Sequence, residues 1–420
     1  MQIVFFHILA IKHKTWFKFH KQAIFDIMRC FKCYLVVLIL LLFYACRHNQ
    51  QNNCIDLTQI SPTSVFEIFS EVKLVKLEPT PGNLIGIISK VIYDNGRYYI
   101  LDARTMEILC FDSDGRFSFK ISALGKGPGE YNNVSDFSID RINGKIVLLD
   151  APMQRLLFFD LEGRFLDERS VVNEQVMGFN RVVFLSDTVL LLSSISNEQL
   201  VFFSLKENRV IKKDFHQEVF LQAFAPTNNV YQFDGYTYAL PALSQQVISV
   251  TETEPHSHYY WCFGKHDNTD KQIDILRKEI EKRTSPYDFF YYAHEAVGKG
   301  NFLHQHIWKV FETSRFSIAL VEFDNNWRHV VIDKSTGEIR VFNHFEEQVS
   351  LSHVSIQEDL VIAYDSGVKD RIKARGAKEW QHRIVDGFNP DILSESDRQT
   401  IANHNPMTDN PFLVVYTFRE

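Results

Sequence analysis

Short apolar runs, each ending in an aspartate and followed by a glycine-containing turn, recur along the first half of the chain. Residues 95–117 show the pattern and match residues 143–165 without a gap. Asp-Gly steps provide the positive φ angles that tight hairpin turns require, so each unit predicts a set of short antiparallel strands. A fixed period in the forties with this content is typical of β-propeller blades.

The repeat predicts an all-β fold, a six-bladed β-propeller over residues 63–420. Weaker strand pairs follow the two clear units at 182–194 with 200–211, 230–240 with 247–263, 316–323 with 327–342, and 360–364 with 412–418. The apolar strand 65–77 has no partner nearby in the sequence. We expect it to complete the last blade beside the C-terminal strand, because closing the ring in this way removes two exposed sheet edges.

Two stretches depart from the strand pattern. Residues 268–300 predict a helical insertion between blades 4 and 5. Thr269 and Gln272 make a capping box, and Ile273, Leu276 and Ile280 fall on one helix face. Residues 367–405 are polar with a weak helical period, which predicts a partly helical segment before the C-terminal strand. Both stretches are expected to project from one end of the propeller, because loops between blades tolerate added length.

The N-terminal region has the features of an export signal. Residues 34–45 form an unbroken apolar run that is too short for a membrane-spanning helix and has the length of a signal-peptide core. Arg29 and Lys32 precede the run, and Cys46 follows it. The pattern predicts a lipoprotein signal peptide at 28–45, lipidation of Cys46 and a tether at 46–62, with an ordinary cleaved secretory signal as the alternative. Residues 1–27 are then a start-site extension.

Charge and cysteine content narrow the function classes. The chain has a formal net charge of −7, and removal of the basic leader makes it more acidic. Nucleic acid is therefore not an expected partner, and the membrane is expected to be reached only through the lipid. The spacing of Cys54, Cys110 and Cys262 predicts neither a disulfide framework nor a metal site. Cys110 lies in an apolar strand and is expected to be a buried, inert thiol.

A glycine-rich loop at residues 125–131 is the most conspicuous motif. Its lysine precedes a glycine where a P-loop needs serine or threonine, and its proline removes an amide that would bind phosphate. We therefore expect a structural turn between blades, with the tyrosine packed between blades and the glutamate bonded to nearby backbone. The loop consists of Gly125, Lys126, Gly127, Pro128, Gly129, Glu130 and Tyr131.

Other candidate residues are expected to be structural. Asp102 and Asp150 recur at equivalent places in two blades, which favours bonding of the following turn over metal binding. His304 and His306 would share one face of a strand, but a metal site needs further ligands that the sequence does not place. No nucleophile motif is present, so no catalytic residue, cofactor or metal is predicted.

These features together resemble a known family. A signal ending in cysteine, Phe-Asp-x-x-Gly-Arg-Phe hairpins, the glycine-rich loop and the terminal segment 410–416 resemble the six-bladed β-propeller lipoproteins of Gram-negative gut-type bacteria, which are similar in pattern to NHL-repeat propellers. The resemblance covers roughly residues 46–420. It implies six blades and a cell-envelope location, and it brings no catalytic residues to transfer.

An aromatic cluster lies at the end of the predicted helical insertion. Exposed, it would form a stacking platform for sugars or a docking patch for a partner; otherwise it pins the insertion to the propeller rim. The cluster, interpreted as the candidate partner-binding site, is Tyr287, Phe289, Phe290, Tyr291 and Tyr292.

The sequence therefore favours a lipid-anchored propeller that binds an envelope protein or a glycan without catalysis. Such a lipoprotein is expected in the outer membrane, facing the periplasm more readily than the cell surface. The alternative is a lyase or hydrolase with its site at the mouth of the central channel, which rests on analogy between folds. A sensor or structural subunit without a small ligand is a third reading.

Overall fold

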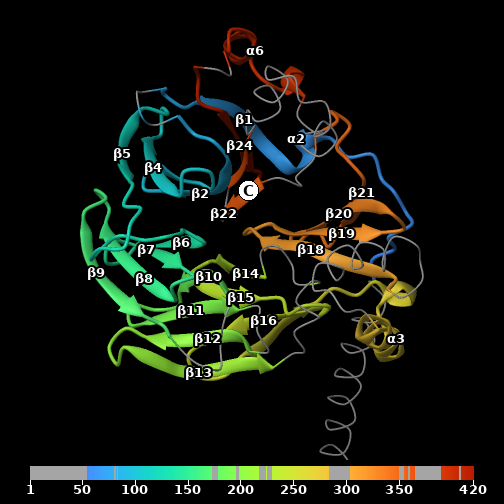
Figure 1. The fold of residues 1–420 in the computed structure, drawn as a ribbon. Helices are drawn as coiled ribbons and strands as arrows, with labels where there is room; N and C mark the ends of the chain where they lie inside the picture. The colour runs from blue at the N-terminus through green and yellow to red at the C-terminus, as the bar shows by residue number, and fades with distance from the viewer. Residues whose placement is uncertain are drawn as a thin grey trace, which may run out of the picture. The chain divides into compact units, whose positions relative to one another are not determined.

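The computed structural model divides into two units, residues 1–55 and residues 56–420, and all strands belong to the second (Figure 1). No helix in the described part of the chain has the length and apolar character needed to cross a membrane. The structure describes residues 54–79, 82, 84–172, 178–194, 198–216, 224, 229–282, 303–349, 354–357, 360–364, 389–405 and 408–420.

Residues 56–420 contain six four-stranded antiparallel sheets, five of which are blades of consecutive strands. Blade 1 comprises β2 (Ile88–Asp94), β3 (Arg97–Asp102), β4 (Glu107–Asp112) and β5 (Phe117–Ile121). Blade 2 comprises β6 (Asp136–Asp140), β7 (Lys145–Asp150), β8 (Arg155–Asp160) and β9 (Phe165–Ser170). Blade 3 comprises β10 (Phe179–Phe184), β11 (Val189–Ser194), β12 (Glu198–Ser204) and β13 (Arg209–His216). The predicted β-propeller fold is confirmed.

Two further blades and a closing sheet complete the ring. Blade 4 comprises β14 (Val230–Phe233), β15 (Tyr236–Ala239), β16 (Gln246–Val250) and β17 (His256–Tyr260). Blade 5 comprises β18 (Gln305–Glu312), β19 (Phe316–Phe323), β20 (Asn326–Asp333) and β21 (Ile339–Phe342). The closing sheet joins β22 (Val354–Gln357), β23 (Leu360–Tyr364) and β24 (Phe412–Phe418) to the N-terminal strand β1 (Phe69–Lys76).

The closing sheet unites the two ends of the propeller. β1 pairs antiparallel with β24, from Phe69 opposite Phe418 to Lys76 opposite Phe412. Helix α2 (Val65–Ile68) precedes β1, and Ser64 and Glu67 form a capping box at its start. Phe69 is fully buried in a core that this sheet shares with blade 5. The prediction that the early strand completes the last blade is confirmed.

Apolar side chains fill the spaces between neighbouring blades. One cluster joins Tyr99 and Cys110 of blade 1 to Phe137 and Leu148 of blade 2, and a second joins blades 2 and 3. Burial raises the pKa of the Cys110 thiol to about 12, so this free cysteine is the buried, inert thiol that was predicted. Each blade is therefore stabilised mainly by the blades on either side.

Helices interrupt the strand pattern where the sequence predicts them. Helix α3 (Asp270–Glu281) follows blade 4, and Thr269 and Gln272 form its capping box. Leu276 is buried. Two 3₁₀ turns, η2 (Gly264–His266) and η3 (Pro390–Ile392), and helix α6 (Glu395–Ala402) make up the other short helices that the structure describes in these regions.

The cysteine spacing predicted no disulfide framework, and in this respect the prediction was wrong. Cys54 and Cys262 are both disulfide-bonded. The prediction relied on the spacing of the cysteines in the sequence, and that spacing does not show which cysteines are bonded in the folded chain.

Two faces of the propeller follow from the strand order. Strand direction alternates within a blade, so every inner strand begins at the same face, which we call the entry face; the opposite face is the exit face. The inner strands are β2, β6, β10, β14, β18 and β22, and they lie closest to the propeller axis (Figure 1).

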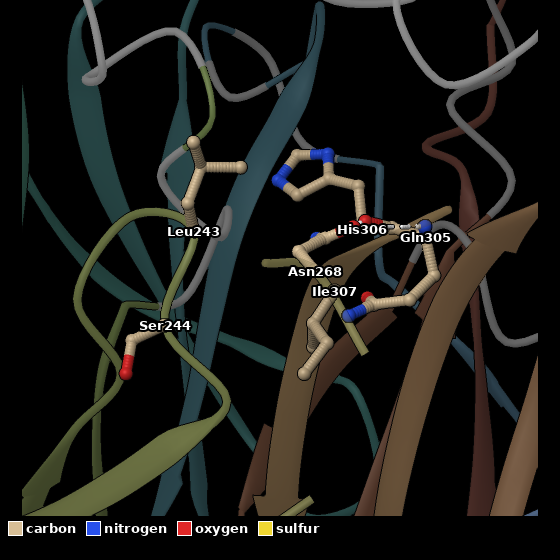
Figure 2. Close-up of a pocket in the computed structure, with 6 residues that line it drawn as sticks. All are labelled: Leu243, Ser244, Asn268, Gln305, His306 and Ile307. Atoms are coloured by element: carbon tan, nitrogen blue, oxygen red, sulfur yellow. Dashed lines mark hydrogen bonds between the residues drawn. The ribbon is translucent and has the colours of Figure 1, made fainter. Parts of the chain in front are cut away.

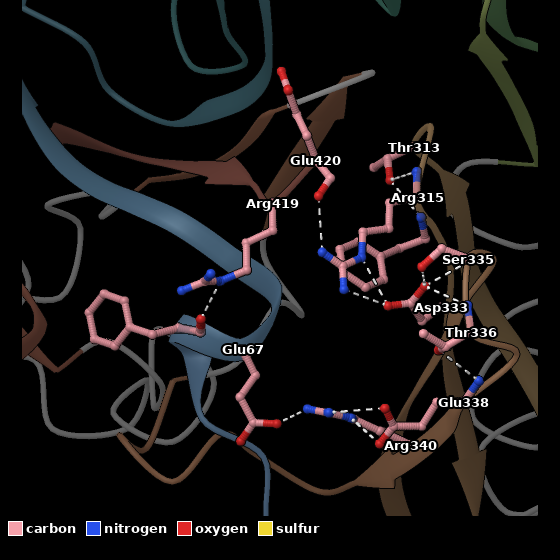
Figure 3. A network of polar contacts seen from close by, with 12 residues as sticks. Glu67, Thr313, Arg315, Asp333, Ser335, Thr336, Glu338, Arg340, Arg419 and Glu420 are labelled. Atoms are coloured by element: carbon pink, nitrogen blue, oxygen red, sulfur yellow. Dashed lines mark hydrogen bonds and ion pairs between the residues drawn. The ribbon is translucent and has the colours of Figure 1, made fainter.

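Polar contacts on the exit face join blade 5 to the closing sheet (Figure 3). Arg315 binds the Asp333 carboxylate, with 2.9 Å between Nε and Oδ2, and also donates to the backbone oxygen of Glu420 at 3.0 Å. Arg340 forms ion pairs with Glu67 and with Glu338. We call these six residues the clasp, because they connect both ends of the propeller to blade 5.

Candidate ligand site on the propeller axis

Five residues near the entry face, four in inner strands and one directly before β14, occupy one equivalent position in five successive blades. In each blade, this residue lies opposite the fifth residue counted from the start of the second strand. The second strand of blade 4 has four residues, so there the fifth is the next residue along the chain. We call this set the axial cluster. The pairs are Lys90 with Leu101, Asp136 with Leu149, Arg181 with Ser193, Asn229 with Leu240, and Lys309 with Leu320.

The three cations of the axial cluster each follow a β-bulge. The register shifts between Ile88 and Lys90 in β2, and equivalent shifts occur directly before Arg181 in β10 and Lys309 in β18. Strand β6, which carries Asp136, pairs with β7 in unbroken register. A bulge increases local twist and changes the direction of the side chain that follows it. Blades 1, 3 and 5 therefore present a basic residue through the same backbone irregularity.

Asp136 connects three blades. Its carboxylate lies 2.8 Å from Nζ of Lys90 and 3.6 Å from Nη1 of Arg181, and it accepts a hydrogen bond of 2.9 Å from the backbone N–H of Val182. Lys90 also donates to the backbone oxygen of Phe137 at 2.7 Å. The carboxylate is almost completely buried, so its charge is committed to these neighbours.

The cations of the axial cluster repel one another. Burial lowers the pKa of Lys90, Asp136 opposes that effect, and the charge of Arg181 adds to it. Burial, followed by the charge of Arg181, lowers the pKa of Lys309 to about 8. Blade 4 lies between the blades that carry Arg181 and Lys309, so this repulsion acts past an intervening blade, near the axis.

The basic side chains are surrounded by protein and still reach solvent. The side chain of Lys90 is 23% exposed and that of Arg181 is 34% exposed. An exposed lysine on a convex surface keeps its ordinary pKa, whereas burial lowers the pKa of Lys90 and Lys309. A charged group binds a counter-ion most strongly when the ion can reach it and the surrounding protein shields it from bulk water.

Asn229 supplies a neutral group at the same position in blade 4. Its Nδ2 donates to Oγ of Ser193 at 2.8 Å, and the residue is buried. Because an amide fits this place in the blade, the blade architecture does not require a cation there.

A crevice between blades 4 and 5 opens on the same face (Figure 2). Asn268 holds one wall by donating to the backbone oxygen of Gln305 at 2.8 Å, and His306 contacts the backbone oxygen of Phe224 at 2.7 Å. The crevice is narrow, and the hydrogen bonds of Asn268 and His306 hold its walls together. Its lining consists of Leu243, Ser244, Asn268, Gln305, His306 and Ile307.

A buried carboxylate between blades 4 and 5 is saturated by donors. Glu312 accepts hydrogen bonds from Tyr231 and Lys334, each at 2.8 Å, and its Oε1 lies 3.0 Å from Nε2 of His258. Burial raises the pKa of Tyr231, which keeps its hydroxyl protonated and able to donate. With both oxygens engaged, this group is suited to joining blades, and it offers no geometry for acid–base chemistry on a substrate.

The glycine-rich loop is closed on itself. Glu130 accepts a hydrogen bond of 2.7 Å from the Gly127 amide, and any side chain at Gly125 would overlap the same carboxylate. Tyr131 is fully buried and donates to the backbone oxygen of Ile121 at 3.2 Å. An acidic side chain thus occupies the amide that a phosphate would need.

Each repeated aspartate binds both the turn that follows its strand and the segment that leads into the inner strand of the same blade. Asp102 accepts hydrogen bonds from the amides of Gly86, Ile87 and Arg104. Asp150 accepts from the amides of Asn132 and Met153. Their predicted structural role is confirmed, and within the described residues no group of three or more potential ligands has metal-binding geometry.

Other predicted site residues are not in the part of the chain that the structure describes. Cys46 and the aromatic cluster at Tyr287, Phe289, Phe290, Tyr291 and Tyr292 lie outside the described residues. The axial cluster was missed by sequence reasoning. Its members share no motif, and only strand register reveals that they are equivalent.

Comparison with known proteins identifies relatives of the whole propeller. Residues 52–417 match the family model described as "Domain of unknown function (DUF4934)". A solved structure described as a "Putative exported protein" from Bacteroides fragilis has a TM-score of 0.66 and 18% identity, covering 86% of this chain and 98% of that one. A member of the DUF4221 family from Bacteroides vulgatus has a TM-score of 0.48 and 10% identity, covering 83% and 98%. No curated protein matches the chain.

Proposed function

The chain belongs to the DUF4934 family, and from that premise we propose that it is an exported, lipid-anchored, six-bladed propeller that binds a component of the cell envelope without catalysis. Similarity to a protein described as exported supports the location. The disulfide-bonded Cys54 and Cys262 support it independently, because disulfides persist in oxidising compartments outside the cytoplasm.

The observation that carries the binding function is the axial cluster on the entry face. The residues that recur between blades, such as Asp102 and Asp150, hold turns. The bulged cations differ from the neutral residue Asn229, which occupies the same position in blade 4. Large apolar side chains are also exposed on connections at this face, among them Leu84, Ile87, Leu124 and Met153. A charged centre with an apolar surround is suited to ligand recognition.

The partner we propose is an envelope protein or a glycan. The aromatic residues from Tyr287 to Tyr292 belong to the connection between blades 4 and 5, which starts and ends on the entry face. Aromatic rings suit both partner classes, since they stack on sugars and anchor protein interfaces. Outer-membrane attachment facing the periplasm remains part of the proposal.

Cys46→Ser tests the anchor. The wild-type protein should partition with membranes and take up a labelled fatty acid, whereas the variant should be released in soluble form. An unlabelled wild type, or a variant that stays with membranes, would remove the lipid anchor from the proposal.

A matched pair of tryptophan substitutions tests the binding face. Ile87 is 44% exposed beside the start of β2 on the entry face, and Ile142 is 87% exposed in the exit-face hairpin of blade 2. The mature protein would be exposed separately to solubilised envelope proteins and to envelope glycans. Ile87→Trp should reduce capture of one fraction by about tenfold, the usual cost of obstructing an interface centre, and Ile142→Trp should not. Equal effects of the two variants would contradict an entry-face site.

A further inference from the structure

The chain that precedes helix α2 is bound to blade 5 along residues 56–63, which we call the strap. The backbone oxygen of Leu57 accepts a hydrogen bond of 3.2 Å from Nε of Arg328, and Leu57 is completely buried. Further along the strap, the amide of Ser61 donates to the backbone oxygen of Val341 at 2.8 Å. The strap is therefore part of the folded propeller, and only the chain before it is left to reach a membrane.

The strap runs from the entry face toward the exit face. Arg328 is the third residue of β20, which begins at the entry face. Val341 lies opposite Val330, farther along the same strand. Glu67, which follows the strap, forms an ion pair with Arg340 of the clasp on the exit face. The chain that precedes the strap therefore leaves the propeller at the entry-face end of blade 5.

Little chain separates the strap from the proposed anchor. Cys46 precedes Leu57 by eleven residues. A fully extended chain of that length spans about 36–40 Å, and a flexible one averages roughly 20 Å between its ends. Strand β20 is eight residues long, so its exit-face end lies about 26 Å beyond its entry-face end. The entry-face end of blade 5 is thus the part of the propeller that the anchor holds nearest to the lipid.

The exposed side chains of the entry face favour a protein partner over a glycan or a lipid. Ile87, Leu124 and Met153 are 44%, 54% and 46% exposed on connections at this face. Aliphatic side chains offer a sugar neither a ring to stack on nor a hydrogen bond, whereas they pack well in the core of a protein interface. The formal net charge of −7 disfavours adhesion to anionic lipid headgroups.

We propose that the strap turns the entry face toward the membrane that holds the anchor, and that the partner of this face is an integral protein of the same membrane. Such a protein presents its extramembrane surface within reach of the short chain that precedes the strap. Holding both proteins at one membrane raises their effective concentration, so binding does not require a high intrinsic affinity. The inference rests on the proposed function and deepens it by naming the class of partner.

Energy transfer from a single labelled cysteine to headgroup-labelled lipid tests the orientation. The full lipidated protein is reconstituted in vesicles of phosphatidylethanolamine and phosphatidylglycerol. Asn326→Cys and Thr336→Cys are a matched pair, because both residues are exposed, one at the entry-face start of β20 and the other in the exit-face turn after it. Since β20 separates them by about 26 Å, transfer from position 326 should be at least about twofold higher. Other thiols do not compete for the label, because Cys110 is buried and Cys54 and Cys262 are disulfide-bonded.

A second pair of labels shows whether the whole entry face is turned toward the lipid. Blade 2 lies across the ring from blade 5 (Figure 1). Met153→Cys places a label on its entry face, and Ile142→Cys places one on its exit face. Transfer should again be higher from the entry face. Equal or reversed transfer within either pair would overturn the orientation, and equality in blade 2 alone would mean that the propeller stands on its edge.

A longer tether tests whether the strap causes the orientation. Insertion of about twenty Gly and Ser residues between Asn53 and Cys54 lengthens the flexible chain and lets the propeller turn more freely. The difference in transfer within each pair should therefore shrink. A difference that the insertion leaves unchanged would assign the orientation to contacts of the entry face and would overturn the role of the strap.

Capture from separate fractions tests the class of partner. Integral proteins from carbonate-washed membranes, soluble envelope proteins and envelope glycans are offered in turn to wild type and to Ile87→Trp. Capture from the integral fraction should fall by about tenfold in the variant. Ile87-dependent capture of soluble proteins or glycans alone would overturn the partner class and leave the binding function intact. A wild type without a lipid anchor, or no effect of Ile87→Trp on any fraction, would instead contradict the proposed function itself.

Discussion

The axial cluster and the clasp both place charged residues between blades, but the two regions differ in how those charges are balanced. In the clasp, Arg315 faces Asp333, and Arg340 faces Glu67 and Glu338. In the axial cluster, Lys90 and Arg181 share the buried carboxylate of Asp136. The clasp connects both ends of the propeller to blade 5, whereas the axial cluster joins blades 1, 2 and 3 through the carboxylate of Asp136.

The pKa shifts in the two regions express this difference. Burial tends to raise the pKa of Asp333, but hydrogen bonds from Ser335 and Arg315 outweigh it and lower that pKa to about 2. The clasp thus stabilises the charged form of its carboxylate. Burial and Arg181 lower the pKa of Lys309 to about 8, so the axial cluster destabilises the charged form of its ammonium. The clasp therefore contains charges that favour folding, whereas the axial cluster contains charges that oppose it.

The largest effect should come from the apolar side of ring closure. Phe69 is completely buried and packs on Tyr416 and Phe418, with ring centroids 5.1 Å and 4.7 Å away. Phe69→Ala should lower the free energy of unfolding by about 3–5 kcal/mol, because it removes a large side chain and leaves a cavity. Denaturant unfolding measures the loss. Capture of the envelope fraction by the folded variant should equal that of wild type, and a parallel loss of capture would show that ring closure and the entry face are coupled.

The next effect should have the opposite sign. Lys309→Met keeps the aliphatic stem and removes a charge that burial and Arg181 disfavour, so we expect about 2 kcal/mol of added stability at pH 7. The folded-state pKa near 8 lies below the unfolded value, so wild-type stability should rise with pH above about 8. The advantage of the variant should shrink over the same interval. Thermal unfolding at pH 7 and pH 10 checks both points, and a destabilised variant at pH 7 would refute the contrast.

The smallest effect should come from the clasp carboxylate. Asp333→Asn should cost about 2 kcal/mol at neutral pH, since one pKa unit corresponds to about 1.4 kcal/mol. The folded-state pKa is about 2, so the contribution is complete above the ordinary value of 3.8 and is lost as the pH falls through about 2. The difference between variant and wild type should therefore narrow below pH 4. If the variant loses the same free energy of unfolding at pH 7 and at pH 3, the changed shape of the side chain, and not its lost charge, causes the effect.

The sequence contained most of the architecture. The matching segments 95–117 and 143–165 predicted blades 1 and 2, and the unpaired apolar strand predicted the β1–β24 closure. The first feature is a repeat that the periodicity of the sequence reveals. The second follows from the need to cover exposed sheet edges. The capping box at Thr269 and Gln272 could also be predicted, because its two residues lie close together in the sequence.

The axial cluster could not be read in this way. Lys90, Arg181 and Lys309 lie far apart in sequence, and each follows a bulge that shifts the register by one residue. A bulge has no fixed sequence signature, so a repeat alignment places these residues out of phase. The disulfide bonding of Cys54 and Cys262 was missed for a related reason, because spacing in the sequence does not show which residues meet in the folded chain.

Pairing of β1 with β24 has a consequence for the order in which the protein is made. Among the strands that the structure describes, β1 is the first to emerge during synthesis or translocation, and its partner β24 is the last. Until residues 412–418 arrive, β1 has no neighbour in its sheet and the buried face of Phe69 has no cover. The propeller can close only after the whole chain has been delivered, so a nascent or truncated chain keeps an open edge that chaperones and proteases can recognise.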